Sequence, residues 1–216
     1  MTFKPYHHCD HLYFTTATVL GWKPLFTRPQ YAAIVLDSLA WHCREERWIL
    51  FAYVLMPNHL HALIKPRAPY TISQVLQSFG SFTAHAILDH LREEQYTAWL
   101  RFFAQRQDKD AGKRHQIWQP IQAKNVYSEP FLRQKLTYIH NNPVAKGWDL
   151  VSERADYSYS SACFYERGEP PRVAVTDIWA WWNGDVDFED DVPAHSAPGE
   201  REAYPLGYVG LGSVRE

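Results

Sequence analysis

The alternation of hydrophobic and polar positions predicts strands and helices that follow one another from residue 11 to residue 142. Runs rich in β-branched and aromatic residues predict strands, and apolar positions three and four apart predict helices. Pro29 and Ser128 are typical of helix starts, and Pro143 ends the last helix. The predicted strands are 11–19, 48–56, 59–65 and 117–126, and the predicted helices are 29–45, 71–94 (opening at Thr71 or Ser73) and 128–142.

The order of these elements is β-α-β-β-α-β-α. The first six are those of a ferredoxin-like antiparallel sheet, so the sequence predicts an α+β fold with an added C-terminal helix. Gly80 lies inside the second helix and is expected to weaken it by roughly 1 kcal/mol relative to alanine. Residues 95–116 combine an apolar segment with a charged loop and yield no clear prediction.

Two histidines lie one residue apart in an apolar strand. The segment 56–64 reads Met-Pro-Asn-His-Leu-His-Ala-Leu-Ile, in which Pro57 and Asn58 predict a turn. Strand side chains alternate between faces, so His59 and His61 are expected to point to the same side. Two imidazoles on one side can hold one metal ion. Taken alone, such a pair is more often structural.

Tyr138 lies in the last predicted helix, four residues before Asn142, so the two share one helix face. A tyrosine hydroxyl is a possible covalent nucleophile, and a metal ion nearby could activate the group that it attacks. Taken alone, a tyrosine in an apolar helix usually packs in the core with its hydroxyl at the surface.

Length, composition and cysteine usage limit the class of protein. The 216 residues suit one domain with an extension, and the hydrophobic fraction of 46% with nine tryptophans provides a substantial core. The three cysteines are an odd number without a close-spaced pair, which predicts a reducing compartment and no disulfide framework. No signal peptide and no 18-residue apolar span is found, so we expect a cytoplasmic protein without membrane contact.

Charge is divided unevenly along the chain. Residues 1–172 carry 20 Lys and Arg against 15 Asp and Glu, a net charge of +5, whereas residues 173–216 carry 2 against 9, a net charge of −7. A mildly basic body suits a phosphate-rich partner, although many solvated surfaces carry as much charge. The acidic end is interpreted either as a segment that reduces non-specific attraction to nucleic acid or as a solubilising extension.

The histidine and tyrosine motifs, taken with their flanks and spacing, resemble the HUH single-tyrosine transposases, and within them the REP-associated tyrosine transposases. The resemblance runs from about His11 to about Ile178. One departure is Gly80, which stands where a lysine is common in the family. The segments that carry the resemblance are 11–16, 56–61, 117–119, 138–144 and 156–161.

The resemblance implies a chemistry for these residues. Tyr138 would attack a phosphate of single-stranded DNA at a short imperfect hairpin, giving a 5′-phosphotyrosine link and a free 3′-hydroxyl. His59, His61 and Asn142 would hold Mg²⁺ or Mn²⁺, for which an amide oxygen is a suitable donor. Asn142 has an alternative role as a helix cap before Pro143. We find no glycine-rich loop of the ATP-binding kind, consistent with energy being conserved in the covalent link.

Contacts to DNA are predicted from cations and aromatic rings, which hold single strands in other proteins. A solvated-surface role is equally compatible with each residue, and His140 is interpreted as a DNA contact or surface residue. The candidates are Lys65, Arg67, Lys113, Arg114, Lys124, Arg133, Lys135 and Lys146, with Trp118 or Tyr127 as stacking faces.

Three functions are weighed. The first is a metal-dependent DNA endonuclease and strand-transferase that acts in transposition, associates with the nucleoid when bound to DNA, and works as a monomer or a homodimer. The second is a catalytically silent or domesticated DNA-binding protein with the same fold, for which Gly80 leaves room. A metal-storing module without nucleic acid leaves Tyr138 unexplained. We assign residues 1–178 to the transposase domain and 179–216 to an acidic appendage whose composition is typical of partial disorder.

Overall fold

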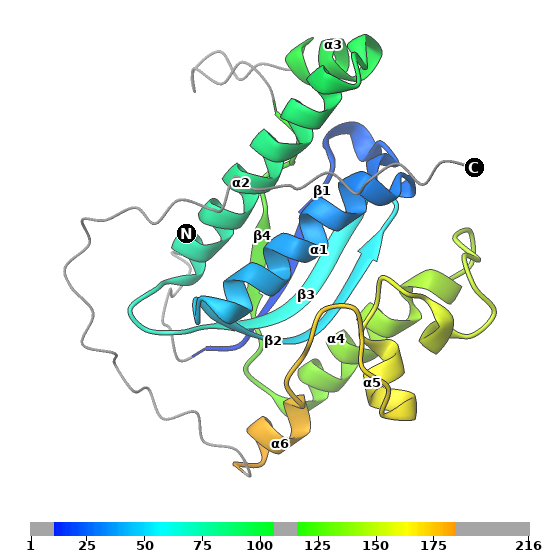
Figure 1. Ribbon diagram of the computed structural model, residues 1–216. Coiled ribbons are helices and arrows are strands. Elements are labelled where there is room, and N and C mark those ends of the chain that lie inside the picture. The colour runs from blue at the N-terminus through cyan, green and yellow to red at the C-terminus, as the bar shows by residue number, and fades with distance from the viewer. Residues whose placement is uncertain (1–10, 106–115, 185–216) are drawn as a thin grey trace, which may run out of the picture.

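The computed structural model describes residues 11–105 and 116–184 (Figure 1). Its centre is a four-stranded sheet in the order β2-β3-β1-β4, and all neighbouring strands are antiparallel. The strands are β1 (Tyr13–Thr18), β2 (Trp48–Met56), β3 (His59–Pro66) and β4 (Gln122–Asn125). Together with helices α1 (Pro29–Arg44) and α2 (Ile72–Glu93), this order confirms the predicted ferredoxin-like α+β fold.

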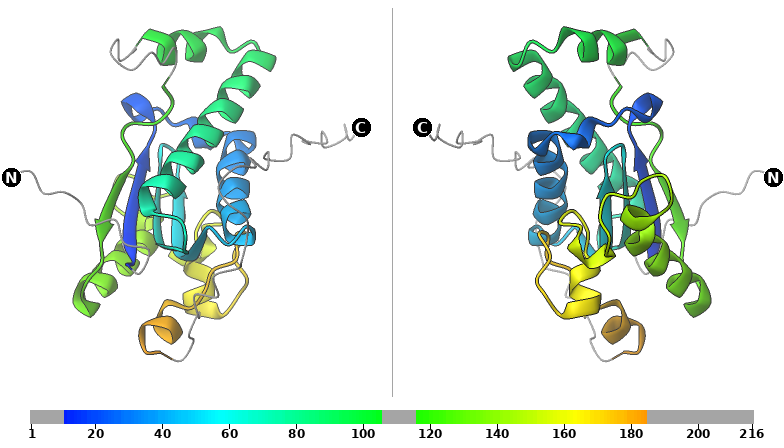
Figure 2. Two further views of the ribbon diagram at one scale, coloured as in Figure 1. Left: turned by 90° about the vertical axis from the view of Figure 1, so that its left-hand side faces the viewer. Right: turned by 90° about the vertical axis from the view of Figure 1, so that its right-hand side faces the viewer.

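Helices cover the sheet on both sides, and Figure 2 shows α1 and α4 on opposite sides of it. Helices α1 and α2 bury one face in a large apolar cluster, which we call the core face. Helix α4 (Glu129–Asn141), α5 (Ala162–Arg167) and α6 (Ile178–Trp182) contribute to a second cluster on the opposite face, which we call the site face. Short 3₁₀ turns complete the described chain: Leu20–Trp22, Leu25–Thr27, Asn142–Val144 and Arg154–Asp156.

Strand β2 has a continuous apolar sequence because both of its faces are buried. Its register against β3 shifts between Leu50 and Ala52, where Phe51 is the extra residue of a bulge. As a result, Phe51 and Ala52 both join the cluster on the site face, while Leu50 and Tyr53 lie in the core face.

The turn between β2 and β3 is fixed from outside by the segment that follows β1. The backbone N–H of Val19 donates to the carbonyl of Asn58 at 2.9 Å, and that of Phe26 donates to the carbonyl of Pro57 at 2.9 Å. The Asn58 side chain also donates to the carbonyl of Trp22 at 3.2 Å. Because these bonds satisfy the turn's backbone groups, the start of β3 is held in one position.

Several element boundaries differ from those predicted. The fourth strand spans only residues 122–125 of the predicted 117–126, because Pro120 has no N–H to give to the ladder. The upstream part of that segment makes only an isolated bridge, between Trp118 and Val19. The unassigned region contains α3 (Thr97–Gln105), and Thr71 with Gln74 forms a capping box at the start of α2.

Gly80 is explained by packing within the core face. A Cβ at this position would lie 2.9 Å from Cδ1 of Ile121, so alanine here would require the end of the Ile121 side chain to shift. The glycine therefore accommodates Ile121 at the cost of helix propensity.

The first residues of the predicted appendage dock on the body. Trp181 packs against Phe51 with 5.0 Å between ring centroids, and Ile178, the last residue of the predicted domain, is fully buried. Residues 185–216 of the predicted appendage lie outside the described residues, so the boundary at 178 stays a prediction. In the described segments, no helix is both long enough and apolar enough to span a membrane.

Candidate metal centre and nucleophile

His59 and His61 lie side by side on the site face of β3. Each side chain is about 5% exposed, and their ring centroids are 4.7 Å apart with the planes at 70°. The alternation of side chains along a strand places both rings on this side, while Leu60 and Ala62 between and beyond them belong to the core face. The predicted common face of the two imidazoles is therefore present.

Both imidazoles are oriented by hydrogen bonds to their Nδ1 atoms. Nδ1 of His59 lies 2.6 Å from Oδ1 of Asn58, and Nδ1 of His61 lies 2.9 Å from Oγ1 of Thr16. The amide oxygen of Asn58 only accepts, so Nδ1 of His59 carries the proton. With the Thr16 hydroxyl as acceptor from Nδ1 of His61, the Nε2 atom of that ring would carry the lone pair. Partners of this kind commonly orient metal-binding histidines.

Burial keeps both imidazoles neutral. It lowers the pKa of His61 from 6.5 to about 3, with a further contribution from the neighbouring His59. Burial also lowers the pKa of His59, and a hydrogen bond with Asn142 opposes this shift. A metal ion binds the neutral form of histidine, so the two rings are in the right protonation state near neutral pH.

Asn142 follows the last residue of α4 and is 7% exposed. Its Nδ2 donates to the carbonyl of Tyr138 at 3.0 Å, and its side chain also hydrogen-bonds His59. The cap and ligand roles are therefore compatible, because the amide nitrogen binds the helix and leaves the amide oxygen free of that bond. Among the described residues, no three or more His, Cys, Asp or Glu side chains are grouped so that they could hold a metal ion.

Tyr138 projects from α4 beside the histidines. Its ring centroid lies 5.1 Å from that of His61 and 6.0 Å from that of Phe14, and its side chain is 47% exposed. The tyrosine thus contacts the histidine pair on one side and solvent on the other. Lys135, one turn earlier, holds its Nζ 5.5 Å from the centre of the Tyr138 ring.

The opposite side of α4 is anchored to the sheet. His140 is 4% exposed, and its Nε2 lies 3.1 Å from Oγ of Ser161. The N–H of Tyr53 in β2 donates to the same Oγ at 3.0 Å. The interpretation of His140 as a DNA contact or surface residue is therefore wrong, because its imidazole is enclosed. Burial lowers the pKa of this imidazole to about 3.

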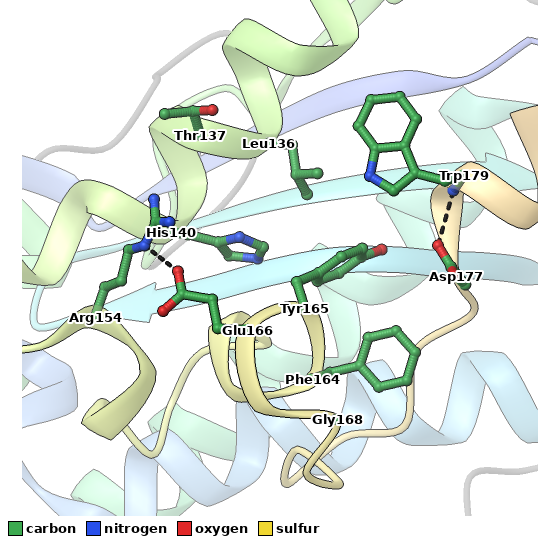
Figure 3. A pocket seen from close by; sticks show the side chains of 10 residues that line it. All are labelled: Leu136, Thr137, His140, Arg154, Phe164, Tyr165, Glu166, Gly168, Asp177 and Trp179. Atoms are coloured by element: carbon green, nitrogen blue, oxygen red, sulfur yellow. Dashed lines mark hydrogen bonds and ion pairs between the residues drawn. The ribbon is translucent and has the colours of Figure 1, made fainter.

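A pocket of about 420 Å³ opens on this reverse side of α4, and Figure 3 shows His140 projecting into it from the helix. Its charged side chains already have partners. Arg154 pairs with Glu166, and Asp177 accepts from the N–H of Trp179 at 2.8 Å. The pocket is separated from Tyr138 by the helix itself, so it is not part of the candidate site.

The predicted DNA contacts are scattered over the molecule. Lys65 is 8% exposed, and Trp118 is 6% exposed and donates from its indole to Thr83 at 2.9 Å. Burial removes Trp118 as a stacking face and leaves Lys65 little access to DNA. Arg67 pairs with Glu46 at 4.0 Å. Arg133 pairs with Glu129 at 2.6 Å, and Lys113 and Arg114 lie outside the described residues. Of the predicted cations, Lys124 and Lys135 lie on the Tyr138 side of the sheet.

Sequence reasoning did not identify Asn58 as the partner of His59 or Thr16 as the partner of His61. The role of Asn58 could have been predicted from the sequence, because Asn58 directly precedes His59 in the turn. The role of Thr16 could not, because its position opposite His61 depends on the register between β1 and β3.

Comparison with known proteins agrees with this architecture. The sequence profile of the family described as IS200-like transposase matches residues 23–107. The fold is similar to a REP-associated tyrosine transposase solved bound to a REP hairpin, with a TM-score of 0.56 and 19% identity over 94% of this chain and 99% of that chain. A proposed transposase from Deinococcus radiodurans has a TM-score of 0.39 and 17% identity over 65% of this chain and 96% of that one, a likeness too low to carry an argument.

No curated protein matches the sequence. The predicted resemblance is nevertheless confirmed by the family profile and by the shared fold. Residues 23–107 match the profile of the IS200-like transposases, and the fold is similar to that of a REP-associated tyrosine transposase.

Proposed function

We propose that the protein cleaves and rejoins single-stranded DNA at hairpin sequences, with Tyr138 as nucleophile and a divalent metal ion as cofactor. The observation that carries the proposal is the 5.1 Å contact between the rings of Tyr138 and His61, which brings the candidate nucleophile beside the histidine pair. A core tyrosine would be enclosed, whereas Tyr138 is 47% exposed beside the histidines.

His59, His61 and the amide oxygen of Asn142 would hold the ion. Two nitrogen donors and one oxygen donor suit Mn²⁺ or Mg²⁺ and leave further positions for water and substrate. When bound, the ion would neutralise charge on the phosphate oxygens and orient the phosphorus. Asn58 and Thr16 would keep the two imidazoles in the required tautomer.

Tyr138 would form a bond from its phenolic oxygen to phosphorus, and the bond from phosphorus to the 3′ oxygen would break. The phenolic proton goes to solvent, and the departing 3′ oxygen takes up a proton to become a hydroxyl. The reverse attack, by a 3′-hydroxyl on the phosphotyrosine, would join strands without ATP because the energy of the phosphodiester is retained.

The position of Tyr138 is fixed from both ends of this helical turn. Asn142 donates to the carbonyl of Tyr138, and His140 connects the helix to β2 through Ser161. A nucleophile on a helix held in this way loses little freedom when the substrate binds, which is the main contribution of positioning to catalysis.

The alternative of a silent DNA-binding protein depended on Gly80, which replaces a lysine common in the family. Ile121 occupies the space that a side chain at position 80 would need. The glycine therefore has a packing explanation and does not favour the alternative.

The test is incubation of the protein with Mn²⁺ and hairpin-bearing single-stranded DNA from the flanks of its own gene, followed by denaturing electrophoresis. We expect a covalent protein–DNA adduct that Tyr138→Phe abolishes, since only the hydroxyl is lost. His59→Ala should also prevent cleavage. Tyr70→Phe is the matched control, because Tyr70 lies between β3 and α2, where it stacks under Arg47. An adduct that persists in Tyr138→Phe would contradict the proposal.

A further inference from the structure

Two cations and two aromatic rings lie between Tyr138 and the sheet edge formed by β4. We call Lys124, Tyr127, Phe131 and Lys135 the edge strip. Lys124 lies in β4, Tyr127 in the connection to α4, and the other two on α4 itself. Helix α4 packs on β2 and β3, whereas Gln122 and Lys124 of β4 are exposed. The strip therefore borders an open part of the site face.

Lys135 lies at the end of the strip nearest Tyr138. Its Nζ lies 4.7 Å from the ring centre of Phe14, 5.2 Å from that of Phe131 and 5.5 Å from that of Tyr138. The ammonium group is thus held among three aromatic rings beside the candidate nucleophile. Cation–π contacts of this kind restrain the side chain while its charge remains available to an anion.

Lys124 adds a second positive charge next to the first. It lies directly opposite Phe14 in the β1–β4 register and shares the site face with it. Repulsion from Lys124 contributes to lowering the pKa of Lys135, after burial. Over residues 11–105 and 116–184, neither lysine forms an ion pair with a carboxylate. Two adjacent cations without a carboxylate are a favourable place for a phosphate.

Tyr127 provides a flat apolar surface at the outer end. Its side chain is 80% exposed, and its ring stacks on Phe131 with 5.8 Å between centroids and 27° between planes. Phe131 supports one side of the ring and leaves much of its surface open to solvent. A large exposed aromatic ring held in this way is suited to stacking on an unpaired base.

We propose that the edge strip binds the unpaired nucleotides next to the phosphate that Tyr138 attacks, with a base stacked on Tyr127 and backbone phosphates at Lys124 and Lys135. The location of that phosphate rests on the proposed function, but the binding itself does not. Single-stranded DNA fits better than duplex, because bases inside a duplex are already stacked and cannot lie on Tyr127.

The test measures binding of a fluorescent 20-nucleotide oligothymidine by anisotropy, in EDTA, at several salt concentrations. The two kinds of contact predict different changes. Lys124→Gln with Lys135→Gln should reduce the slope of log affinity against log salt by about 1.4, since each phosphate contact on a single strand contributes about 0.7. Tyr127→Ala should weaken binding about tenfold, within the range for one stacked base, and leave the slope unchanged.

Matched variants separate contact from folding. Tyr127→Phe keeps the ring and should retain binding. Arg44→Gln removes one exposed cation at the end of α1 and should leave the slope unchanged. The proposal is overturned if the wild-type protein does not bind the oligonucleotide, if it binds a 20-base-pair duplex more tightly, or if the lysine variants keep the wild-type slope. Because the assay requires neither metal nor cleavage, its failure leaves the Tyr138 adduct to be judged separately.

Discussion

The core face and the site face of the sheet are built from alternate residues of the same strands, yet they differ in chemistry. In β3, Leu60, Ala62 and Ile64 join the apolar cluster under α1 and α2, while His59 and His61 meet Tyr138 on the other side. In β1, Thr15 is buried toward the core face and Thr16 bonds His61. One strand can therefore stabilise the fold with one set of residues and position reactive groups with the next.

The largest expected difference between the two faces is in stability. Phe79→Ala should lower the free energy of unfolding by ~3–5 kcal/mol, because Phe79 is 1% exposed and packs against His42, Trp48 and Trp118. Tyr138→Phe on the site face should change it by less than about 0.5 kcal/mol. Urea denaturation measures both, and equal losses would contradict the division.

Acid should destabilise the protein through histidines on both faces. Burial lowers the pKa of His42 from 6.5 to about 4, so between these values only the unfolded chain binds the proton. Stability is therefore complete above pH 6.5 and falls as the pH is lowered toward 4, by about 3 kcal/mol for this residue.

His42→Phe tests this contribution, because it keeps a ring stacked on Trp48 and removes the titrating group. Urea unfolding at pH 7.5, 6 and 5 should give a smaller loss in the variant. An identical pH dependence in both proteins would show that His42 titrates normally.

Metal affinity should distinguish two neighbouring threonines. Thr16→Val removes the hydroxyl that bonds Nδ1 of His61 and should weaken Mn²⁺ binding by roughly 10- to 100-fold, the usual effect of losing such a partner. Thr15→Val removes a hydroxyl that bonds Ala62 on the core face and should leave the affinity unchanged. Calorimetric titration measures the Mn²⁺ affinity of each variant. Equal affinities in the two variants would exclude the orienting role of Thr16.

The smallest expected effect concerns the contact between Gly80 and Ile121. Gly80→Ala gains up to about 1 kcal/mol in helix propensity but meets Cδ1 of Ile121, so its net effect on stability should stay within about 0.5 kcal/mol. In an Ile121→Val background, which lacks that methyl group, the same change should stabilise the protein. Thermal denaturation measures the stability changes of the two substitutions, alone and together. If these changes simply add, the contact between positions 80 and 121 does not contribute to stability.

Local periodicity was sufficient for the parts of the site that lie within one element. The strand period predicted the common face of His59 and His61, and the helical period predicted that Tyr138 and Asn142 share a turn. The predicted strand 48–56 was confirmed, although its bulge was not foreseen, because a run that is apolar on both sides carries no sign of a change in register.

Long-range pairing explains what the sequence did not predict. His140 was assigned to the surface because Ser161, its partner, is 21 residues away. Trp118 was read as a stacking face because its hydrogen bond to Thr83 on α2 depends on tertiary packing. Pro120 was present in the sequence and could have limited the fourth strand, so that boundary was a missed local signal.

The most direct test of the central claim is to map the residue that carries the DNA. Adduct formed with Mn²⁺ and hairpin DNA would be digested with nuclease and trypsin and analysed by mass spectrometry. Cleavage after Lys135 and Lys146 releases a peptide in which Tyr138 is the only tyrosine, and Tyr127 falls in a different peptide. We predict a nucleotide phosphate on Tyr138. A modification on any other residue, or unmodified Tyr138 in a protein that has cleaved its DNA, would contradict the mechanism.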